Sequence, residues 1–275
     1  MFQVNARLLY NKRIKKNCHE MALSAPQIAK SALPGQFINI KVTDGLEPLL
    51  RRPFSIHQIY RQDGIKILYE AIGKGSKALA RRKSGESLDV IGPLGNGFKL
   101  GRGPGAGGRR HVLVAGGMGT APLVFLAERL AEAKNQKPKT KTLVLLGART
   151  KDDILCEKEF KELGCEVRIA TDDGSRGFKG YVSELLKDEL NAIRYPLSAI
   201  YACGPTPMLK EISRISQEYD IPAQISLEAH MACGIGACMG CVIKTARNAL
   251  RATEYEYKRV CKEGPVFEAS RVIWD

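Results

Sequence analysis

The sequence predicts a β + α/β protein: a small antiparallel β-barrel, then a doubly wound domain with a parallel sheet, then a cysteine-rich C-terminal segment. Up to about residue 100, short runs alternate apolar and polar side chains, as the strands of an antiparallel barrel do. Beyond residue 110, apolar runs alternate with helical stretches, which is typical of a parallel sheet covered by helices. Near the C-terminus, three cysteines fall within nine residues and a fourth follows.

The barrel is expected over residues 1–100. The run from Ile38 to Val42 alternates apolar and polar residues, and a second such run extends from Ile65 to Tyr69. Successive side chains of a strand point to opposite faces, so each run offers one apolar face to a core. Turn residues separate these runs, which favours short antiparallel strands over helices.

The α/β domain is expected over residues 101–224. Its first ten residues, 101–110, include five glycines and predict a linker. Strands of a parallel sheet are expected at four apolar runs: Val112–Ala115, Leu143–Leu146, Val167–Ala170 and Ala199–Ala202. An apolar stripe over residues 207–219 predicts an amphipathic helix whose buried face belongs to the core.

Length and charge restrict the classes of function. A chain of 275 residues has room for about two domains. A net charge of +14 favours polyanions in general, but the basic residues are scattered and accompany no nucleic-acid motif. We therefore expect a solvated basic surface or an acidic partner protein. No signal peptide or membrane span is expected, and a cytoplasmic location follows.

The segment 225–275 carries the most specific pattern. Cys233, Cys238 and Cys241 have Cys-x4-Cys-x2-Cys spacing, and nineteen residues separate the third from Cys261. This order matches the plant-type [2Fe–2S] ligand pattern. Structural zinc is the alternative, but zinc sites usually use two short pairs of cysteines. The spacing therefore predicts an iron–sulfur cluster and single-electron transfer.

Two glycine-rich or proline-rich turns predict a nucleotide site in the α/β domain. The first predicted strand runs into Gly116-Gly117-Met118-Gly119-Thr120-Ala121-Pro122, where the start of a helix can hold a pyrophosphate. Pro122 stands where the third glycine of G-x-G-x-x-G belongs, so a tight structural turn is the alternative. Cys203-Gly204-Pro205 follows another strand, at the edge where open α/β sheets bind ligands.

Two motifs in the barrel suit a flavin. Arg52-Pro53-Phe54-Ser55 presents a guanidinium and a hydroxyl beside a fixed proline backbone, which suits the diphosphate and ring of a flavin nucleotide. Gly73-Lys74-Gly75-Ser76 supplies a second turn in which backbone N–H groups and a hydroxyl can meet phosphate. A surface arginine pair and a plain turn are the alternatives for these two motifs.

Together, and in their order along the chain, the four motifs resemble those of the ferredoxin-NADP reductase-like flavoproteins. The cysteine-rich stretch 228–241, with residues 257–267, resembles the electron-transfer subunits of NAD-dependent dihydroorotate dehydrogenase B, the PyrK family. The resemblance covers nearly the whole chain. It implies an FAD-binding barrel, an NAD domain and a [2Fe–2S] cluster held by Cys233, Cys238, Cys241 and Cys261.

The resemblance also implies roles for individual residues. It assigns FAD binding to residues of three barrel segments: Arg52, Pro53, Phe54, Ser55, Leu68, Tyr69, Glu70, Gly75 and Ser76. It assigns the dinucleotide to residues of two turns, with the cysteine near the nicotinamide: Gly117, Gly119, Cys203, Gly204 and Pro205. The choice between NAD and NADP stays open, with NAD favoured, because Arg149 and Lys151 could meet a 2′-phosphate.

The function that follows is electron transfer without a catalytic acid or base in this chain. A flavin is needed between a hydride carrier and a one-electron cluster. A substrate-oxidising TIM barrel needs about 250 residues, so a partner chain must supply it. The resemblance implies that the partner carries FMN and oxidises dihydroorotate. It implies that the electrons pass through the cluster and FAD to NAD+, in pyrimidine (UMP) biosynthesis. It also implies a heterotetramer of two copies of each chain.

Two other functions stay open. One is a flavin and iron–sulfur NAD(P)H reductase subunit of another redox complex, of the ferredoxin-NADP reductase, hydrogenase or sulfide dehydrogenase type. The other is a non-enzymatic module with structural zinc that docks on nucleic acid. Visible absorption separates these two functions, because flavin and iron–sulfur clusters absorb visible light and zinc does not.

Overall fold

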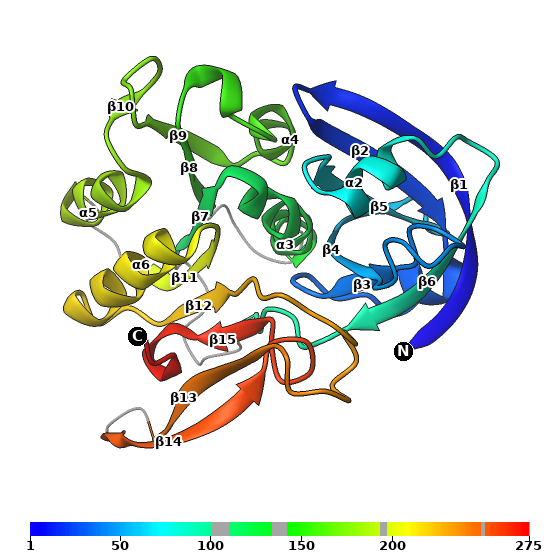
Figure 1. Ribbon diagram of the computed structural model, residues 1–275. Helices are drawn as coiled ribbons and strands as arrows, with labels where there is room; N and C mark the ends of the chain where they lie inside the picture. The colour runs from blue at the N-terminus through cyan, green and yellow to red at the C-terminus, as the bar shows by residue number, and fades with distance from the viewer. Residues whose placement is uncertain (101–109, 134–141, 193–196, 249–250, 275) are drawn as a thin grey trace. The chain divides into compact units, whose positions relative to one another are not determined.

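The computed structural model describes residues 1–100, 110–133, 142–192, 197–248 and 251–274 (Figure 1). Residues 101–109 of the predicted linker lie outside the described residues. The chain forms two compact units: Met1–Gly97, Ala229–Val242 and Lys258–Pro265 make the first, and Phe98–Glu228, Ile243–Tyr257 and Val266–Asp275 the second. The positions of the two units relative to one another are not determined.

The first unit is built on a closed antiparallel barrel. Its six described strands, in order around the barrel, are β1 (Phe2–Lys15), β2 (Cys18–Ser24), β5 (Gly64–Glu70), β4 (Arg52–Tyr60), β3 (Phe37–Ile40) and β6 (Ser87–Leu94). Both alternating runs form strands as predicted, although β3 ends at Ile40, two residues before the run does. Ile65 and Ile67 are fully buried, as an inward-facing row requires. The short helices α1 (Pro26–Ser31) and α2 (Lys74–Ala80) connect the strands.

The second unit is built on a mixed sheet. Its seven described strands, from one edge to the other, are β10 (Phe178–Lys179), β9 (Glu166–Thr171), β8 (Leu143–Ala148), β7 (Arg110–Gly116), β11 (Leu197–Cys203), β12 (Ala223–Ser226) and β15 (Val266–Glu268). All neighbours pair in parallel except β15, which is antiparallel to β12. All four strands predicted for the parallel sheet are confirmed.

Helices cover this sheet in two groups, with α3 (Thr120–Ala133) beside α4 (Glu157–Glu162) and α5 (Val182–Ala192) beside α6 (Thr206–Glu218) (Figure 1). The predicted helix over 207–219 is confirmed as α6, which buries Leu209, Ile212 and Ile215. From β7 the chain order runs one way to β8 and β9 and the other way to β11 and β12. The strand order therefore reverses between β7 and β11, where open α/β sheets bind ligands.

The C-terminal segment 225–275 is shared between the two units. The cysteine-bearing stretches Ala229–Val242 and Lys258–Pro265 belong to the barrel unit, whereas β12 and β15 complete the sheet of the second unit. The hairpin β13 (Val242–Asn248) and β14 (Arg251–Arg259) connects the two cysteine-bearing stretches. A helix long and apolar enough to cross a membrane does not occur in the described part of the chain.

Candidate functional site

The four predicted cluster ligands come together in the first unit. Cys233 and Cys238 have their Sγ atoms 3.3 Å apart, and the N–H of Cys261 donates to Sγ of Cys241 at 3.5 Å. The N–H of Gly236 hydrogen-bonds to the Cys261 thiol and joins the loop to the returning chain. All eight cysteines of the chain are described, and none forms a disulfide. Four thiols with N–H groups directed at sulfur fit an iron–sulfur cluster.

The surroundings of the thiols differ in polarity. Burial raises the pKa of Cys233, but N–H groups of Cys238, Ile235 and Ala237 outweigh it and lower this pKa to about 6. Burial raises the pKa of the Cys261 thiol to about 12, and its cysteine neighbour adds to the effect. A metal centre binds thiolates, so ligation would release the proton that burial keeps on Cys261.

The loop that carries three of the cysteines depends on two glycines. Gly234 and Gly236 have φ of +69° and +84°, a region that side chains rarely adopt. A Cβ on Gly234 would lie 2.4 Å from Nδ2 of Asn39, and one on Gly236 would lie 2.6 Å from Cδ of Lys262. The loop therefore needs glycine for its backbone conformation and for its close contact with neighbouring side chains.

Polar side chains fix this loop to the rest of the first unit. Nδ2 of Asn39 donates to the carbonyl of Cys233 at 3.1 Å, and Arg259 donates to the carbonyl of Gly236 at 2.6 Å. Arg259 also forms an ion pair with Glu263 at 2.5 Å. These contacts tie the cysteine loop both to the barrel strand β3 and to the turn that carries the fourth cysteine.

A third contact fixes the returning chain. Nδ2 of Asn96 donates to the carbonyls of Lys262 and Glu263 at 3.2 and 3.0 Å. Asn39 and Asn96 were not predicted as functional residues, because each contacts residues far away in the chain and lies in no motif. Arg259 lies two residues before the fourth cysteine, within the stretch 257–267 that carries the resemblance, and this position is the signal that could have identified it.

The two neighbouring arginines of the proposed flavin motif have different partners. Arg51 forms an ion pair with Asp89, whereas Arg52 donates to the carbonyl of Leu50 at 2.6 Å and has no carboxylate partner among the described residues. A Cβ on Gly75 would meet Arg52 Nε at 2.8 Å, so the guanidinium lies against the first turn of α2. Arg52 and Gly75, 23 positions apart in the chain, are therefore brought together.

The aromatic residues of the proposed flavin site lie side by side. Phe54 and Tyr69 have ring centroids 5.5 Å apart, and the Tyr69 hydroxyl donates to Oδ1 of Asn11 at 2.9 Å. Leu68 and Tyr69 are buried in the barrel, while Glu70 is exposed. Tyr69 therefore supports Phe54 from within the core.

The remaining barrel residues of the set lie on β3, β4 and α2. Pro53 pairs with Asn39 and Ser55 with Phe37 across the β3–β4 ladder. Ser76 Oγ accepts hydrogen bonds from the N–H groups of Ile72 and Gly73 at 3.0 and 3.1 Å. The hydroxyl of Ser76 thus caps the start of α2 and shapes the turn that meets Arg52.

The two predicted dinucleotide turns meet at the β7–β11 switch point. A Cβ on Gly119 would lie 2.0 Å from the carbonyl oxygen of Cys203, and one on Gly204 would lie 3.0 Å from the nitrogen of Gly116. Gly117 has φ of +53° and open space where its Cβ would be. Pro205 closes the second turn before α6 begins at Thr206. The turns pack against each other, and of these three glycines only Gly117 has room for a side chain.

The Cys203 thiol at this edge is protonated near neutral pH. It is 4 % exposed, and burial followed by the charge of Glu228 raises its pKa to about 12. A neutral, buried thiol is a small apolar neighbour for a ligand at the switch point rather than a nucleophile.

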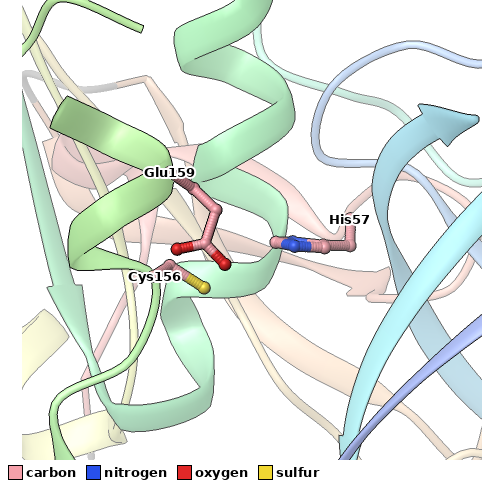
Figure 2. Close-up of side chains that lie close together, drawn as sticks. All are labelled: His57, Cys156 and Glu159. Carbon is pink, nitrogen blue, oxygen red and sulfur yellow. The ribbon is translucent and has the colours of Figure 1, made fainter. Parts of the chain in front are cut away.

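A second group of potential metal-binding side chains carries no site. Figure 2 shows Cys156 and Glu159 at the start of α4, where Cys156 has the left-handed φ of 59°. The figure also labels His57, which belongs to β4 of the first unit. Because the placement of the units is not determined, no metal site is assigned to these three residues.

Comparison with known proteins identifies the family. Residues 228–273 match the iron–sulfur cluster binding domain of dihydroorotate dehydrogenase B, and residues 113–214 match the oxidoreductase NAD-binding domain. The dihydroorotate dehydrogenase B (NAD(+)) electron transfer subunit of Desulforamulus reducens is 42% identical over 98% of both chains. The chain belongs to this family of electron transfer subunits. The subunit of the same name from Geobacillus sp. is 39% identical over 99% of both chains.

Solved structures agree with the family's fold. A chain of the NADH-dependent reduced ferredoxin-NADP oxidoreductase has a TM-score of 0.82 and 27% identity, over 98% of this chain and 90% of that one. A ferredoxin NADP+ reductase from Neisseria gonorrhoeae has a TM-score of 0.65 at 18% identity, over 79% and 91% of the chains, and shows the fold alone. The resemblance and the fold class predicted from the sequence are confirmed.

Proposed function

We propose that this electron transfer subunit holds FAD on its barrel, a [2Fe–2S] cluster on Cys233, Cys238, Cys241 and Cys261, and NAD at the β7–β11 switch point. The observation that carries the proposal is the convergence of four thiols in one loop and one turn. A flavin exchanges one or two electrons, so it connects a hydride carrier to a one-electron cluster.

The chain's own residues bind and orient these groups. Arg52 would pair with the FAD diphosphate beside the α2 turn, and Phe54 would face the ring system with Tyr69 behind it. Gly117 would let a pyrophosphate approach the turn before α3, because there is open space where its Cβ would be. NAD is favoured over NADP by the names of the relatives.

The substrate is oxidised by a partner. The relatives' name, electron transfer subunit, supports a separate catalytic chain. We infer that this partner contains FMN, oxidises dihydroorotate in pyrimidine biosynthesis, and assembles with this chain as a heterotetramer of two copies of each. The electrons reach NAD+ through this chain. The cytoplasmic location stays a prediction from the sequence.

The experiment is a coupled assay on the complex. The chain is purified anaerobically with the protein that co-elutes from its own cell, and NADH is measured after dihydroorotate and NAD+ are added. Cys238→Ser should remove the cluster's visible absorption and iron while leaving the flavin absorption and NADH-to-dye activity, and should abolish dihydroorotate-linked NADH formation. Cys165→Ser, outside the ligand set, is the control and should change none of these. An unchanged dihydroorotate-linked rate in Cys238→Ser would contradict the proposed path.

A second candidate is a reductase subunit of a ferredoxin-linked complex. The TM-score of 0.82 to the NADH-dependent reduced ferredoxin-NADP oxidoreductase chain favours it. This candidate function predicts that the complex reduces ferredoxin and does not oxidise dihydroorotate. NADH formation from dihydroorotate by the purified complex would exclude it, and ferredoxin reduction without dihydroorotate activity would support it.

A further inference from the structure

Asn39 is the one polar side chain of an otherwise apolar strand. β3 consists of Phe37, Ile38, Asn39 and Ile40, and all four residues are buried. Asn39 is only 1 % exposed. An amide in an apolar environment costs free energy unless its hydrogen bonds are satisfied. If the side chain at this position only packed in the barrel core, an apolar residue like its neighbours would suffice.

The amide of Asn39 uses only part of its hydrogen-bonding capacity. Nδ2 donates to the carbonyl of Cys233, while Oδ1 is buried and has no hydrogen-bond partner within the described residues. Asn11 of the same barrel differs, because its Nδ2 donates to two backbone carbonyls and its Oδ1 accepts from Tyr69. Asn39 thus makes one side-chain hydrogen bond, to the cysteine loop, and its Oδ1 has no partner among the described residues.

The loop lies directly on this amide. A Cβ on Gly234 would come within 2.4 Å of Nδ2 of Asn39. The backbone that follows Cys233 is therefore in close contact with the Asn39 side chain of β3. The hydrogen bond of 3.1 Å fixes the loop at its first cysteine. Any shift of the Asn39 side chain therefore moves the backbone of a cluster ligand.

Asn39 also neighbours the proposed flavin strand. It pairs directly with Pro53 in the antiparallel β3–β4 ladder, within the run Arg52–Ser55. Residues directly opposite each other in such a ladder place their side chains on the same face, a few ångströms apart. One residue therefore contacts the cysteine loop and adjoins the strand that carries the flavin motif.

We propose that Asn39 is a positioning residue for electron transfer, which fixes the loop at Cys233 to the barrel and so sets the place of the cluster relative to the flavin. This rests on the proposed function, because it assumes a cluster on the four cysteines and a flavin on β4. The hydrogen-bond partners of metal ligands orient those ligands, and their loss typically lowers metal affinity or activity.

The test is Asn39→Leu in the full chain with its partner. Leucine has a similar volume and suits the apolar strand, so we expect the melting temperature to stay at or above that of the wild type. We expect the rate of electron transfer from flavin to cluster, measured by stopped-flow absorption after NADH is added, to fall about 10- to 100-fold. Flavin reduction by NADH should keep its rate, and the EPR spectrum of the reduced cluster should change.

Gln36→Leu is the matched control. Gln36 is a half-buried amide of the same barrel whose Nε2 donates to the carbonyl of Gly95 at 2.7 Å. Its replacement removes this hydrogen bond and the one that its Oε1 accepts from the N–H of Leu33 at 2.8 Å. Neither bond involves the cysteine loop, so the EPR spectrum and the flavin-to-cluster rate should stay unchanged. Asn39→Ser, whose hydroxyl is too short to reach the loop, gives the same test if Asn39→Leu does not fold.

The outcomes separate the two proposals. An Asn39→Leu protein with full iron and sulfide content, a wild-type EPR spectrum and an unchanged flavin-to-cluster rate would overturn the positioning role. A wild-type chain that binds no cluster or whose flavin NADH does not reduce would overturn the proposed function instead. Loss of rate with equal loss in Gln36→Leu would show a general effect of barrel stability and would also overturn the role of Asn39.

Discussion

At the scale of single residues, the difference between Arg51 and Arg52 lies in their partners. Arg51 is held by the carboxylate of Asp89. Within the described part of the chain, the partners of Arg52 are backbone carbonyls, and its guanidinium lies against the turn of α2. A guanidinium without a carboxylate partner is available for a diphosphate. This difference favours a structural role for Arg51 and the proposed diphosphate-binding role for Arg52.

Arg52→Ala is therefore expected to weaken FAD retention. The charge-assisted contact that it removes is worth about 1.5–3 kcal/mol, or roughly a 10- to 100-fold rise in the dissociation constant for FAD. Flavin content after extensive dialysis measures the effect. Arg51→Ala is the matched variant and should lower the melting temperature while FAD is retained. Full flavin occupancy in dialysed Arg52→Ala would exclude the proposed contact.

The Arg51–Asp89 pair makes stability depend on pH. Burial raises the pKa of Asp89, but hydrogen bonds from Arg51 and Gln3 outweigh it and hold this pKa below its usual value. A carboxylate with a lowered folded-state pKa adds stability above its unfolded pKa of about 4, and this stability is lost as the pH falls through the folded value.

Asp89→Asn should accordingly destabilise the protein at pH 7 and have little effect at low pH. The pair is partly exposed, so we expect a loss of about 0.5–1 kcal/mol in the free energy of unfolding at pH 7. Urea unfolding of both proteins from pH 7 down to pH 3 measures it. A difference that stays constant or grows towards pH 3 would show that another interaction causes the destabilisation.

At the scale of elements, the end of β14 and the following turn act together on the cysteine loop. Arg259 donates to the carbonyl of Gly236 and pairs with Glu263, four residues later. The hydrogen bond to Glu263 is the main cause of the raised pKa of Arg259, and Cys261 and Cys241 add to it, so the guanidinium lies close to the proposed ligand set. A positive charge near a cluster favours its reduced state.

Arg259→Gln should lower the reduction potential of the cluster, and Glu263→Gln should raise it. The signs are opposite because the first removes a positive charge and the second a negative charge from the same pair. A redox titration followed by EPR measures both. Arg82→Gln is the control, because Arg82 likewise pairs with a glutamate four residues on and donates to the carbonyl of Val42. Shifts of the same sign in both variants would contradict the electrostatic account.

The two turns at the switch point also act as one unit. Gly119→Ala would place a Cβ 2.0 Å from the carbonyl oxygen of Cys203, so one of the turns must move. We expect a loss of about 1–3 kcal/mol in stability and weaker NADH binding. Thermal unfolding and NADH titration measure these effects. Gly45→Ala, with nothing within 4 Å of its Cβ, is the control and should behave like the wild type.

At the scale of the whole molecule, the chain passes repeatedly between the two units. After β12 it enters the barrel unit with three cysteines, leaves it through the β13–β14 hairpin, returns with Cys261 and ends in the second unit with β15. Val266 and Phe267 of β15 are each 8 % exposed and pair with β12. The last strand of the second unit's sheet therefore follows all four proposed cluster ligands in the chain.

The sequence by itself predicted the fold class, the helix α6, two strands of the barrel and four strands of the parallel sheet, and it indicated the four cysteines as the proposed cluster ligands. These depend on local periodicity and spacing, because alternation, apolar stripes and ligand intervals are properties of short stretches. The resemblance carried by the ordered motifs then determined the family. Contacts between distant stretches have no such local signal, and the sequence could not reveal them.

Only the tertiary structure decided which side chains surround these motifs. Asn39 and Cys233 are 194 positions apart, and Asn96 and Lys262 are 166 apart. The difference between Arg51 and Arg52 likewise depends on which strand brings Asp89 near, and the contact of Gly119 with Cys203 depends on the adjacency of β7 and β11. The sequence determined the chemistry of the ligands, and packing decided which residues hold them in place, because packing joins parts of the chain that are far apart.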